Sequence, residues 1–338
     1  MMSLDKAKLL SSDRSFLLSH SQRRFFMKKI GLALIGLALC FSLASCSYGG
    51  KQTDEKNNLT YTYEDQSITL KAPPKKVLTL SAPLLNMAYA VGGTSIGRPA
   101  TSSDIPEEAK SLPIIGQVAH INVETLIGLQ PDFILGEKKQ NGKLESLLQS
   151  NKLSYLLINY DGINDNVPLM EFLGKIYGTE DQASKVIKIY QDGIDAAIKR
   201  GEQYKPAKVI VLRATGKSVT AETPRSICAS MTELLKMHNV ISDHKDIDFS
   251  LKTVPYSLEQ LSADDPEIIF VVTMSKPENM DEVNKKMDEQ MRNNPAWKNI
   301  NAVKNGRVYY LPMNLFLMNP GVHTPDALNK LLDLAYKK

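Results

Sequence analysis

Histidine, tryptophan and cysteine are scarce in this chain of 338 residues, which holds five His, one Trp and three Cys. The HExxH motif of zinc proteases, the phosphate-binding P-loop and the glycine-rich nucleotide fingerprint are missing. A dehydrogenase would carry GxGxxG after its first strand, and the segment KVLTLSAPLLNMA (76–88) has none. We therefore expect a protein without enzymatic activity.

The sequence also has no apolar run long enough to span a membrane. Its most apolar segment, IGLALIGLALCFSLAS (30–45), has 16 residues and no charge, whereas a spanning helix needs about 20. Basic residues precede this segment: Arg23, Arg24, Lys28 and Lys29. This order of a basic patch and a short apolar run predicts a signal peptide over residues 1–45.

The apolar run ends in Leu-Ala-Ser-Cys, which resembles the bacterial lipobox and predicts lipidation of Cys46. Cys40 fits that motif less well, because the bulky Leu39 precedes it. QRRFFMK (22–28) also resembles a twin-arginine export motif, and the alternative is an ordinary Sec signal that starts at Met27. Cys228 would then be the one remaining thiol, so no internal disulfide is expected.

Removal of the signal peptide changes the charge balance. The full chain has 41 Lys and Arg against 37 Asp and Glu, and residues 1–45 hold seven of these bases and two of the acids. The remaining 34 bases and 35 acids give a net charge of −1. The basic balance of the whole chain thus gives no argument for nucleic acid binding.

Short apolar, β-branched runs alternate with helical patterns along the rest of the chain, which predicts an α/β fold with parallel sheets. The expected strands are 76–81, 132–136, 154–159, 208–213, 267–273 and 307–312. The expected helices between them are 123–129, 144–149, 226–238, 258–261, 280–292 and 325–336.

One stretch interrupts this alternation with two consecutive helices, over 168–177 and from Glu180 to about Tyr204. The second has apolar residues every three to four positions and is long enough, at roughly 36 Å, to join two lobes as a stiff strut. The alternative is a surface helix within one domain. The predicted domains are the signal peptide 1–45, a lipid-anchored tether 46–59, an α/β lobe 60–167, linker helices 168–205 and an α/β lobe 206–338.

Several segments resemble the iron, heme and corrinoid branch of the solute-binding proteins of ABC importers. They are PPKKVLTLS, SIGRPA, IIGQVAHINVETLIGLQPDFILG, YSLEQLSADDPEIIFVV, NPAWKNINAVKNGRVYYLP and HTPDALNKLLDL. The resemblance implies two Rossmann-like lobes joined by one rigid helix, the class III periplasmic-binding-protein fold, with the ligand in the cleft. It also implies a monomer that works with an ABC permease and its ATPase, docking through one glutamate of each lobe, Glu124 and Glu259. Helix dipoles alone would also favour carboxylates at these helix starts.

Within this family, the sequence is most similar to heme receptors of Gram-positive iron-regulated surface systems. Those receptors hold heme iron with a Met from the first lobe and a His from the second. Here Ala119 takes the place of that Met, with His120 beside it, and Met274 takes the place of that His. The resemblance therefore implies a swapped axial pair, and imidazole with thioether can fill both faces of a heme iron. The cleft would add apolar walls and cations for the propionates: Leu84, Leu85, Phe316, Met318, Arg98 and Arg225.

A ferric-siderophore or corrinoid carrier of the same fold is the alternative. The chelator already fills the coordination of the iron, so such a carrier needs arginine and aromatic contacts alone: Arg98, Arg213, Arg225, Tyr160 and Tyr256. A zinc or manganese receptor would need three or four converging ligands, and His120 has no such neighbours in the sequence. His323 is interpreted as part of a helix start, and His238 and His244 as surface residues.

Overall fold

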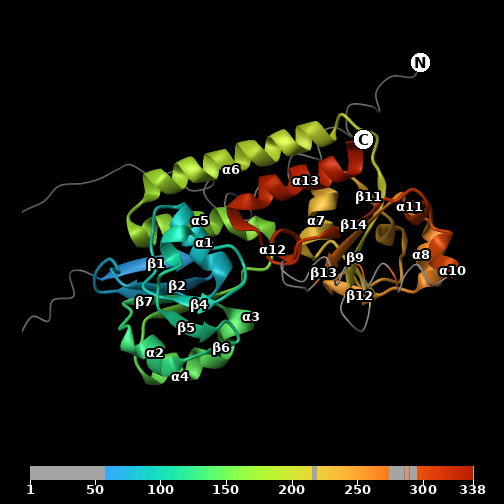
Figure 1. The fold of residues 1–338 in the computed structure, drawn as a ribbon. Coiled ribbons are helices and arrows are strands. Elements are labelled where there is room, and N and C mark those ends of the chain that lie inside the picture. Colours follow the sequence, from blue (N-terminus) through green and yellow to red (C-terminus); the bar gives the residue numbers. More distant parts are fainter. Residues whose placement is uncertain (1–57, 215–218, 274–284, 286–288, 290–294, 338) are drawn as a thin grey trace, which may run out of the picture. The chain divides into compact units, whose positions relative to one another are not determined.

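Each half of the protein is built on a sheet whose central strands are parallel and mainly apolar (Figure 1). The computed structural model describes residues 58–214, 219–273, 285, 289 and 295–337. All of these belong to one unit, Asp54–Lys338. We call the part built on the first sheet the first lobe and the part built on the second sheet the second lobe.

The first lobe contains a three-stranded sheet in the order β3-β7-β8, with all strands parallel. These strands are β3 (Val77–Thr79), β7 (Phe133–Glu137) and β8 (Tyr155–Ile158). A smaller sheet consists of β4 (Arg98–Ala100), β5 (Ile114–Gln117) and β6 (His120–Ile121). The helices of this lobe are α1 (Ala82–Ala90), α2 (Val123–Gly128), α3 (Lys138–Asn141) and α4 (Glu145–Ser150).

The second lobe contains a six-stranded sheet in the order β12-β10-β9-β13-β14, with β11 also paired to β9. The parallel strands are β9 (Lys208–Ala214), β11 (His238–Asn239), β13 (Ile268–Thr273) and β14 (Val308–Leu311). The strands β10 (Val219–Glu222) and β12 (Thr253–Pro255) extend the sheet in antiparallel fashion. The helices are α7 (Ile227–Leu234), α8 (Leu258–Asp264), α10 (Pro295–Lys298), α11 (Asn301–Lys304), α12 (Met313–Phe316) and α13 (Thr324–Tyr336).

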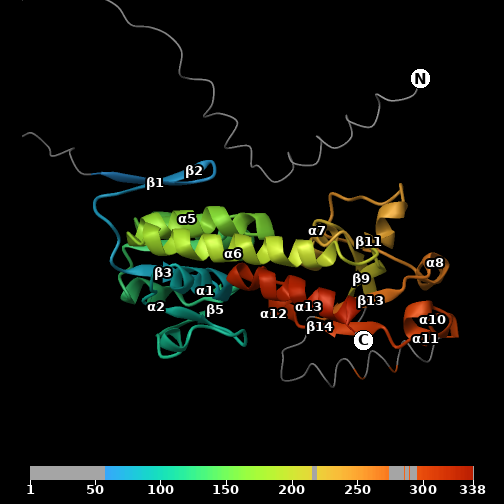
Figure 2. The same cartoon turned by 90° about the horizontal axis from the view of Figure 1, so that it is seen from above.

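Two helices join the lobes, α5 (Asn166–Tyr177) and α6 (Glu180–Gly201), and they run side by side in Figure 2. Gly178 separates them with a φ of 67°, a left-handed conformation that glycine adopts without strain. Near its start α6 buries Ala183 and Tyr190 in the core of the first lobe. Near its end it buries Ala197 in the core of the second lobe. Because one unbroken helix packs into both cores, it acts as the strut that the sequence predicts.

The strands and the linker lie close to their predicted positions, and the α/β class is confirmed. All six predicted strands are present within two residues of their expected ends, and α6 ends at Gly201, three residues before Tyr204. Of the predicted helix 280–292 only Lys285 and Glu289 are described, and both are helical. The sequence missed the hairpin of β1 (Leu59–Tyr63) and β2 (Gln66–Leu70), which begins at the last residue of the predicted tether.

The buried amide of Asn166 connects both lobes and the strut. Its Oδ1 accepts a hydrogen bond from the hydroxyl of Tyr160 at 2.7 Å. Its Nδ2 donates to the Tyr190 hydroxyl of α6 at 2.9 Å, and to Gly321 O and Thr324 Oγ1 of the second lobe at 3.2 Å each. Asn166 is 0% exposed, so none of these partners can be replaced by water without rearrangement.

Substitution of Asn166 by Leu is expected to lower the free energy of unfolding by about 3 kcal/mol, because several buried polar groups would lose their partner. Urea denaturation followed by circular dichroism measures this loss. Asn164→Leu, at an exposed position two residues earlier, is the control and is expected to change stability by less than about 0.5 kcal/mol. Equal stability of the two variants would contradict the role of Asn166.

Candidate functional site

A cavity of about 550 Å³ lies between the lobes. The first lobe lines it with α1 and with the loop 103–106, and the second lobe with α12, the loop 318–323 and the start of α13. Its apolar lining includes Met87, Ile105, Leu315, Met318 and Val322, and Tyr89 adds an aromatic ring. Cavities of this size with a few polar groups among apolar walls are typical of small-molecule sites.

Local sequence explains how each lobe reaches the cavity. After β3 the chain turns at Ser81, whose hydroxyl caps α1 by accepting the N–H of Leu84, and Pro83 occupies the first turn. The first residues of α1 therefore project beyond the carboxyl end of a parallel strand, where α/β proteins bind ligands. From the other lobe the segment after β14 approaches, and Ser103 Oγ lies 4.0 Å from Met318 Sδ across the gap.

The polar groups of the cavity include one histidine with a fixed ring. His323 precedes α13, and its Nδ1 lies 3.0 Å from Asp326 Oδ2. A carboxylate at one ring nitrogen orients an imidazole and leaves its other nitrogen available as a ligand. The prediction that His323 belongs to a helix start is correct for the backbone, since Pro325 lies in the first turn of α13. The sequence did not show that this histidine also lines a cavity.

The predicted site residues fall into different environments. Met318 lines the cavity. Leu84 and Phe316 do not, because both side chains are 0% exposed and pack in the hydrophobic cores of their lobes. This corrects their assignment as cleft walls; Leu85 is likewise fully buried. Met274 and Cys46 lie outside the described residues.

The predicted cations also differ in their surroundings. The guanidinium of Arg98 donates to the backbone carbonyl of Lys110 at 3.0 and 3.3 Å, so it holds its own loop in place. Arg225 is exposed and lies three residues after the end of β10, and its backbone N–H donates to Thr223 Oγ1 at 3.2 Å. His120 is exposed on β6, where it pairs with Gln117, and it is not part of the cavity lining.

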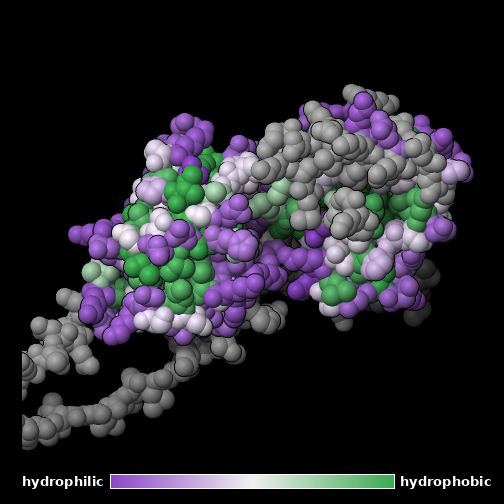
Figure 3. All heavy atoms as spheres, turned by 60° about the horizontal axis from the view of Figure 1, so that its bottom comes forward, coloured by the Kyte–Doolittle hydropathy of each residue, from purple (hydrophilic) through white to green (hydrophobic). Residues whose placement is uncertain are grey.

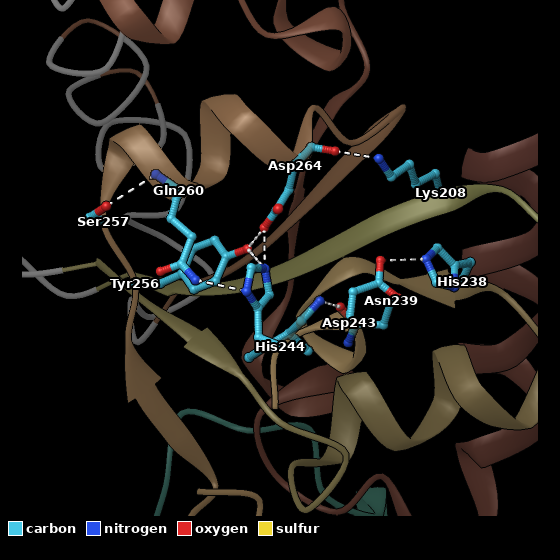
Figure 4. Close-up of polar contacts among 10 residues, drawn as sticks. Lys208, His238, Asn239, Asp243, His244, Tyr256, Ser257, Gln260 and Asp264 are labelled. Atoms are coloured by element: carbon cyan, nitrogen blue, oxygen red, sulfur yellow. Dashed lines mark hydrogen bonds and ion pairs between the residues drawn. The ribbon is translucent and has the colours of Figure 1, made fainter. Parts of the chain in front are cut away.

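Tyr256 belongs to a separate polar cluster in the second lobe, drawn in Figure 4. Its hydroxyl donates to Asp264, which also contacts His244 Nε2 at 2.7 Å. Gln260 Nε2 lies 3.0 Å from His244 Nδ1, which closes the cluster. The prediction of His244 as a surface residue was wrong, because its side chain is only 21% exposed. This cluster fixes α8 against the segment before β12.

The two predicted docking glutamates have matching positions. Glu124 lies in the first turn of α2, which Asn122 caps, and Glu259 lies in the first turn of α8, which Ser257 caps. Both glutamates are exposed. Apolar side chains are also exposed nearby, Ile127 on α2 at 37% and Ile114 on the neighbouring β5 at 51%. In Figure 3, hydrophobic residues drawn in green are visible on the surface of the first lobe, at the left of the view.

The sequence contains a GxSxG pattern at residues 93–97. In hydrolases this pattern exposes a nucleophilic serine. Here Ser95 is 5% exposed, accepts the N–H of Thr79 at 3.1 Å and donates to Gly97 O at 2.8 Å. The serine therefore holds a turn beside β3, and its hydroxyl is occupied by the backbone.

Within the described ranges, no group of three or more His, Cys, Asp or Glu side chains could hold a metal ion. In the same ranges, no helix is both long and apolar enough to cross a membrane.

Two lobes on parallel sheets, one strut helix and a cavity lined from both sides define the class of two-lobed binding proteins. Residues 77–315 match the periplasmic binding protein family, and the chain belongs to this family. The predicted class III fold and the predicted non-enzymatic role are confirmed, since the relatives are solute-binding proteins.

Three known proteins illustrate the likeness. The high-affinity heme uptake system protein IsdE of Staphylococcus aureus (strain Newman) is 26% identical over 244 residues, which is 72% of this chain and 80% of that protein. An ABC transporter substrate-binding protein from Listeria monocytogenes EGD-e has a TM-score of 0.68 at 24% identity, covering 78% of this chain and 99% of its own. Staphylococcus aureus SirA complexed with staphyloferrin B has a TM-score of 0.66 at 21% identity, covering 82% and 98%.

A buried ion pair lies at the ends of two strands of the second lobe. Glu222 of β10 is 0% exposed, and its Oε1 accepts hydrogen bonds from Arg213 of β9 at 2.7 and 2.8 Å. Burial raises the pKa of Glu222 above its ordinary value, although the charge of Arg213 offsets part of this effect.

The raised pKa of Glu222 predicts a pH dependence of stability. The unfolded chain ionises Glu222 near its ordinary pKa of 4.5, whereas the folded chain resists ionisation to a higher pH. Between these two pKa values, a rise in pH therefore lowers the free energy of unfolding of the wild type. Glu222→Gln has no ionisable group at this position, so its stability lacks this dependence on pH. Urea denaturation of both proteins at about pH 4 and about pH 7 should show the wild type losing stability relative to the variant as pH rises. A constant or opposite difference would mean that the folded protein does not raise this pKa.

Proposed function

We propose that this protein is the extracytoplasmic substrate-binding component of an ABC importer and that its ligand is an iron compound, heme before others. The observation that carries this proposal is a cavity shared by both lobes in a chain that aligns with a heme uptake protein over 72% of its length. Apolar walls, two thioethers and an aromatic ring suit a flat, largely apolar macrocycle. The ligand would be handed to a permease driven by its ATPase.

The chemistry of the N-terminal segment supports an exported, anchored protein. We propose that a signal peptide is removed before Cys46 and that lipid on this cysteine holds the protein at the outer face of the cytoplasmic membrane. The polar residues up to Asn58 would then act as a tether, with β1 starting at Leu59. In this role the protein acts as a monomer.

The proposed axial ligands of the heme iron are His120 from the first lobe and Met274 from the second. One imidazole and one thioether would fill both axial positions, which suits transport without oxygen chemistry. His323 is a second candidate for the nitrogen ligand, because it lines the cavity and its ring is oriented by Asp326.

Hemin added to purified protein comprising residues 46–338 is expected to give a low-spin absorption spectrum. His120→Ala and Met274→Ala should each disturb this spectrum, because each removes one axial ligand. His323→Ala tests the second nitrogen donor in the same way. His238→Ala is the matched control, since this exposed histidine contacts Asp243 outside the cavity.

Two outcomes of this titration would contradict the heme proposal. If hemin does not bind, the heme proposal is replaced by the hypothesis of a ferric-siderophore carrier, which the likeness of the fold to SirA would allow. If hemin binds with a spectrum that none of the histidine and methionine changes affects, the assigned axial ligands are wrong.

Docking on the permease is proposed to use Glu124 and Glu259. The double variant Glu124→Ala with Glu259→Ala is expected to abolish cellular uptake and leave the ligand affinity unchanged, because both side chains lie outside the cavity. Uptake of labelled ligand and equilibrium titration measure the two quantities. Glu171→Ala with Glu289→Ala removes the same charge from other exposed positions and should preserve uptake. Loss of affinity in the first variant would refute the docking role.

A further inference from the structure

Among the described residues that line the cavity, none is a lysine or arginine that could pair with an anionic ligand. The carboxylates of this lining are Asp104 and Asp326. A heme carries two propionates, which are ionised at neutral pH, and siderophores often present carboxylates too. A ligand of this kind would therefore need its counter-charge from residues beside the cavity rather than from the lining.

Two lysines from opposite lobes meet at one aspartate next to this cavity. Lys139 is the second residue of α3 in the first lobe, and its Nζ lies 2.5 Å from Asp161 Oδ2. Lys252 precedes β12 of the second lobe, and its Nζ lies 3.3 Å from Asp161 Oδ1 and 3.2 Å from Asp161 O. We call these three residues the lysine bridge. Its two positive charges share one carboxylate.

Hydrogen bonds of neighbouring residues link the lysine bridge to the cavity lining and to the loop of His120. Gly162, next to Asp161, accepts a hydrogen bond at 2.7 Å from Asn319, which lines the cavity. On the other side, Asn141 of α3 donates to Val118 O at 2.9 Å, two residues before His120. The lysine bridge is therefore one residue removed from a contact of the cavity lining.

Other charges near the bridge leave its lysines available. Burial alone would raise the pKa of Asp161, but Lys139 and Lys252 outweigh it and hold this pKa below its ordinary value, so the aspartate stays ionised. Glu137 and Glu222 are two further carboxylates that interact with Lys252, and burial raises the pKa of both, which reduces their negative charge. Lys139 is 63% exposed and Lys252 is 36% exposed, so an incoming anion can reach both.

The side chains of two arginines, Arg98 and Arg213, are held by other partners. Arg98 donates to the carbonyl of Lys110, and Arg213 is paired with the buried Glu222. A lysine ammonium is a point charge with three donors, and one that contacts aspartate at 3.3 Å can turn to a second carboxylate at small cost.

We propose that Lys139 and Lys252 form a binding subsite for a carboxylate of the transported ligand, one lysine from each lobe, with Asp161 as their resting partner. This inference rests on the proposed function. Because the subsite spans both lobes, an anionic ligand would be held by both at once, and a neutral analogue of the same shape would lose these contacts.

Titration of the wild type with hemin and with hemin dimethyl ester, whose carboxylates are masked, tests the subsite. The ester should bind about ten- to a hundredfold more weakly than hemin, as expected for the loss of charged hydrogen bonds. Lys139→Ala with Lys252→Ala should weaken hemin binding by a similar factor and leave ester binding unchanged. Lys143→Ala with Lys245→Ala removes the same charge from exposed positions, one before β8 and one before β12, and should not affect hemin.

The outcomes separate this inference from the proposed function. If the wild type binds neither compound, the heme proposal fails and the subsite inference falls with it. If hemin binds but the ester binds equally well, or if the two lysine pairs weaken hemin equally, the subsite is wrong and heme transport stands. The comparison of hemin with its ester uses the wild type, so it remains decisive even if a lysine variant folds poorly.

Discussion

The buried amide of Asn166 is the constraint on which the arrangement of the lobes depends. One side chain satisfies hydroxyl and carbonyl groups from the first lobe, from the strut α6 and from the second lobe. Buried polar groups of this kind cost free energy unless all of them are paired, so the network has few alternative geometries. It fixes the loop of Gly321 and the start of α13, which form one wall of the cavity.

The site is assembled from segments that are short and irregular, in contrast to the sheets that carry them. Segments after β3, β4 and β14 supply the cavity, and segments after β7 and β8 supply Lys139 and Asp161 of the lysine bridge. The carboxyl ends of parallel strands face the same edge of a sheet, which favours such an arrangement. The sheets are buried on both faces and contribute stiffness. Within each lobe the loops therefore carry the binding chemistry, and the sheet carries the stability. The buried pair of Glu222 and Arg213 lies at the ends of two strands of the second sheet, β10 and β9.

The fold could be predicted largely from the sequence because apolar runs and helical periodicity act locally. The strut α6 is an example, with Gly178 before it and Pro206 after it in the chain. The site could be predicted only in part. Leu84 and Phe316 look like cleft residues by position, yet the first turn of α1 and the short helix α12 direct them into the cores. The cavity role of His323 depends on the approach of the two lobes, and Lys139 and Lys252 meet through Asp161, which lies 91 positions from Lys252. A single sequence carries no signal for contacts between such distant residues.

The strut has a consequence for how a loaded carrier is recognised. A helix anchored in two cores resists bending, because any large rotation would open both cores and break the amide network at its side. The empty and the filled protein would then present nearly the same outline to a membrane partner. The partner would have to sense bound ligand through small rearrangements beside the cavity, where a ligand carboxylate would replace Asp161 as the partner of the two lysines.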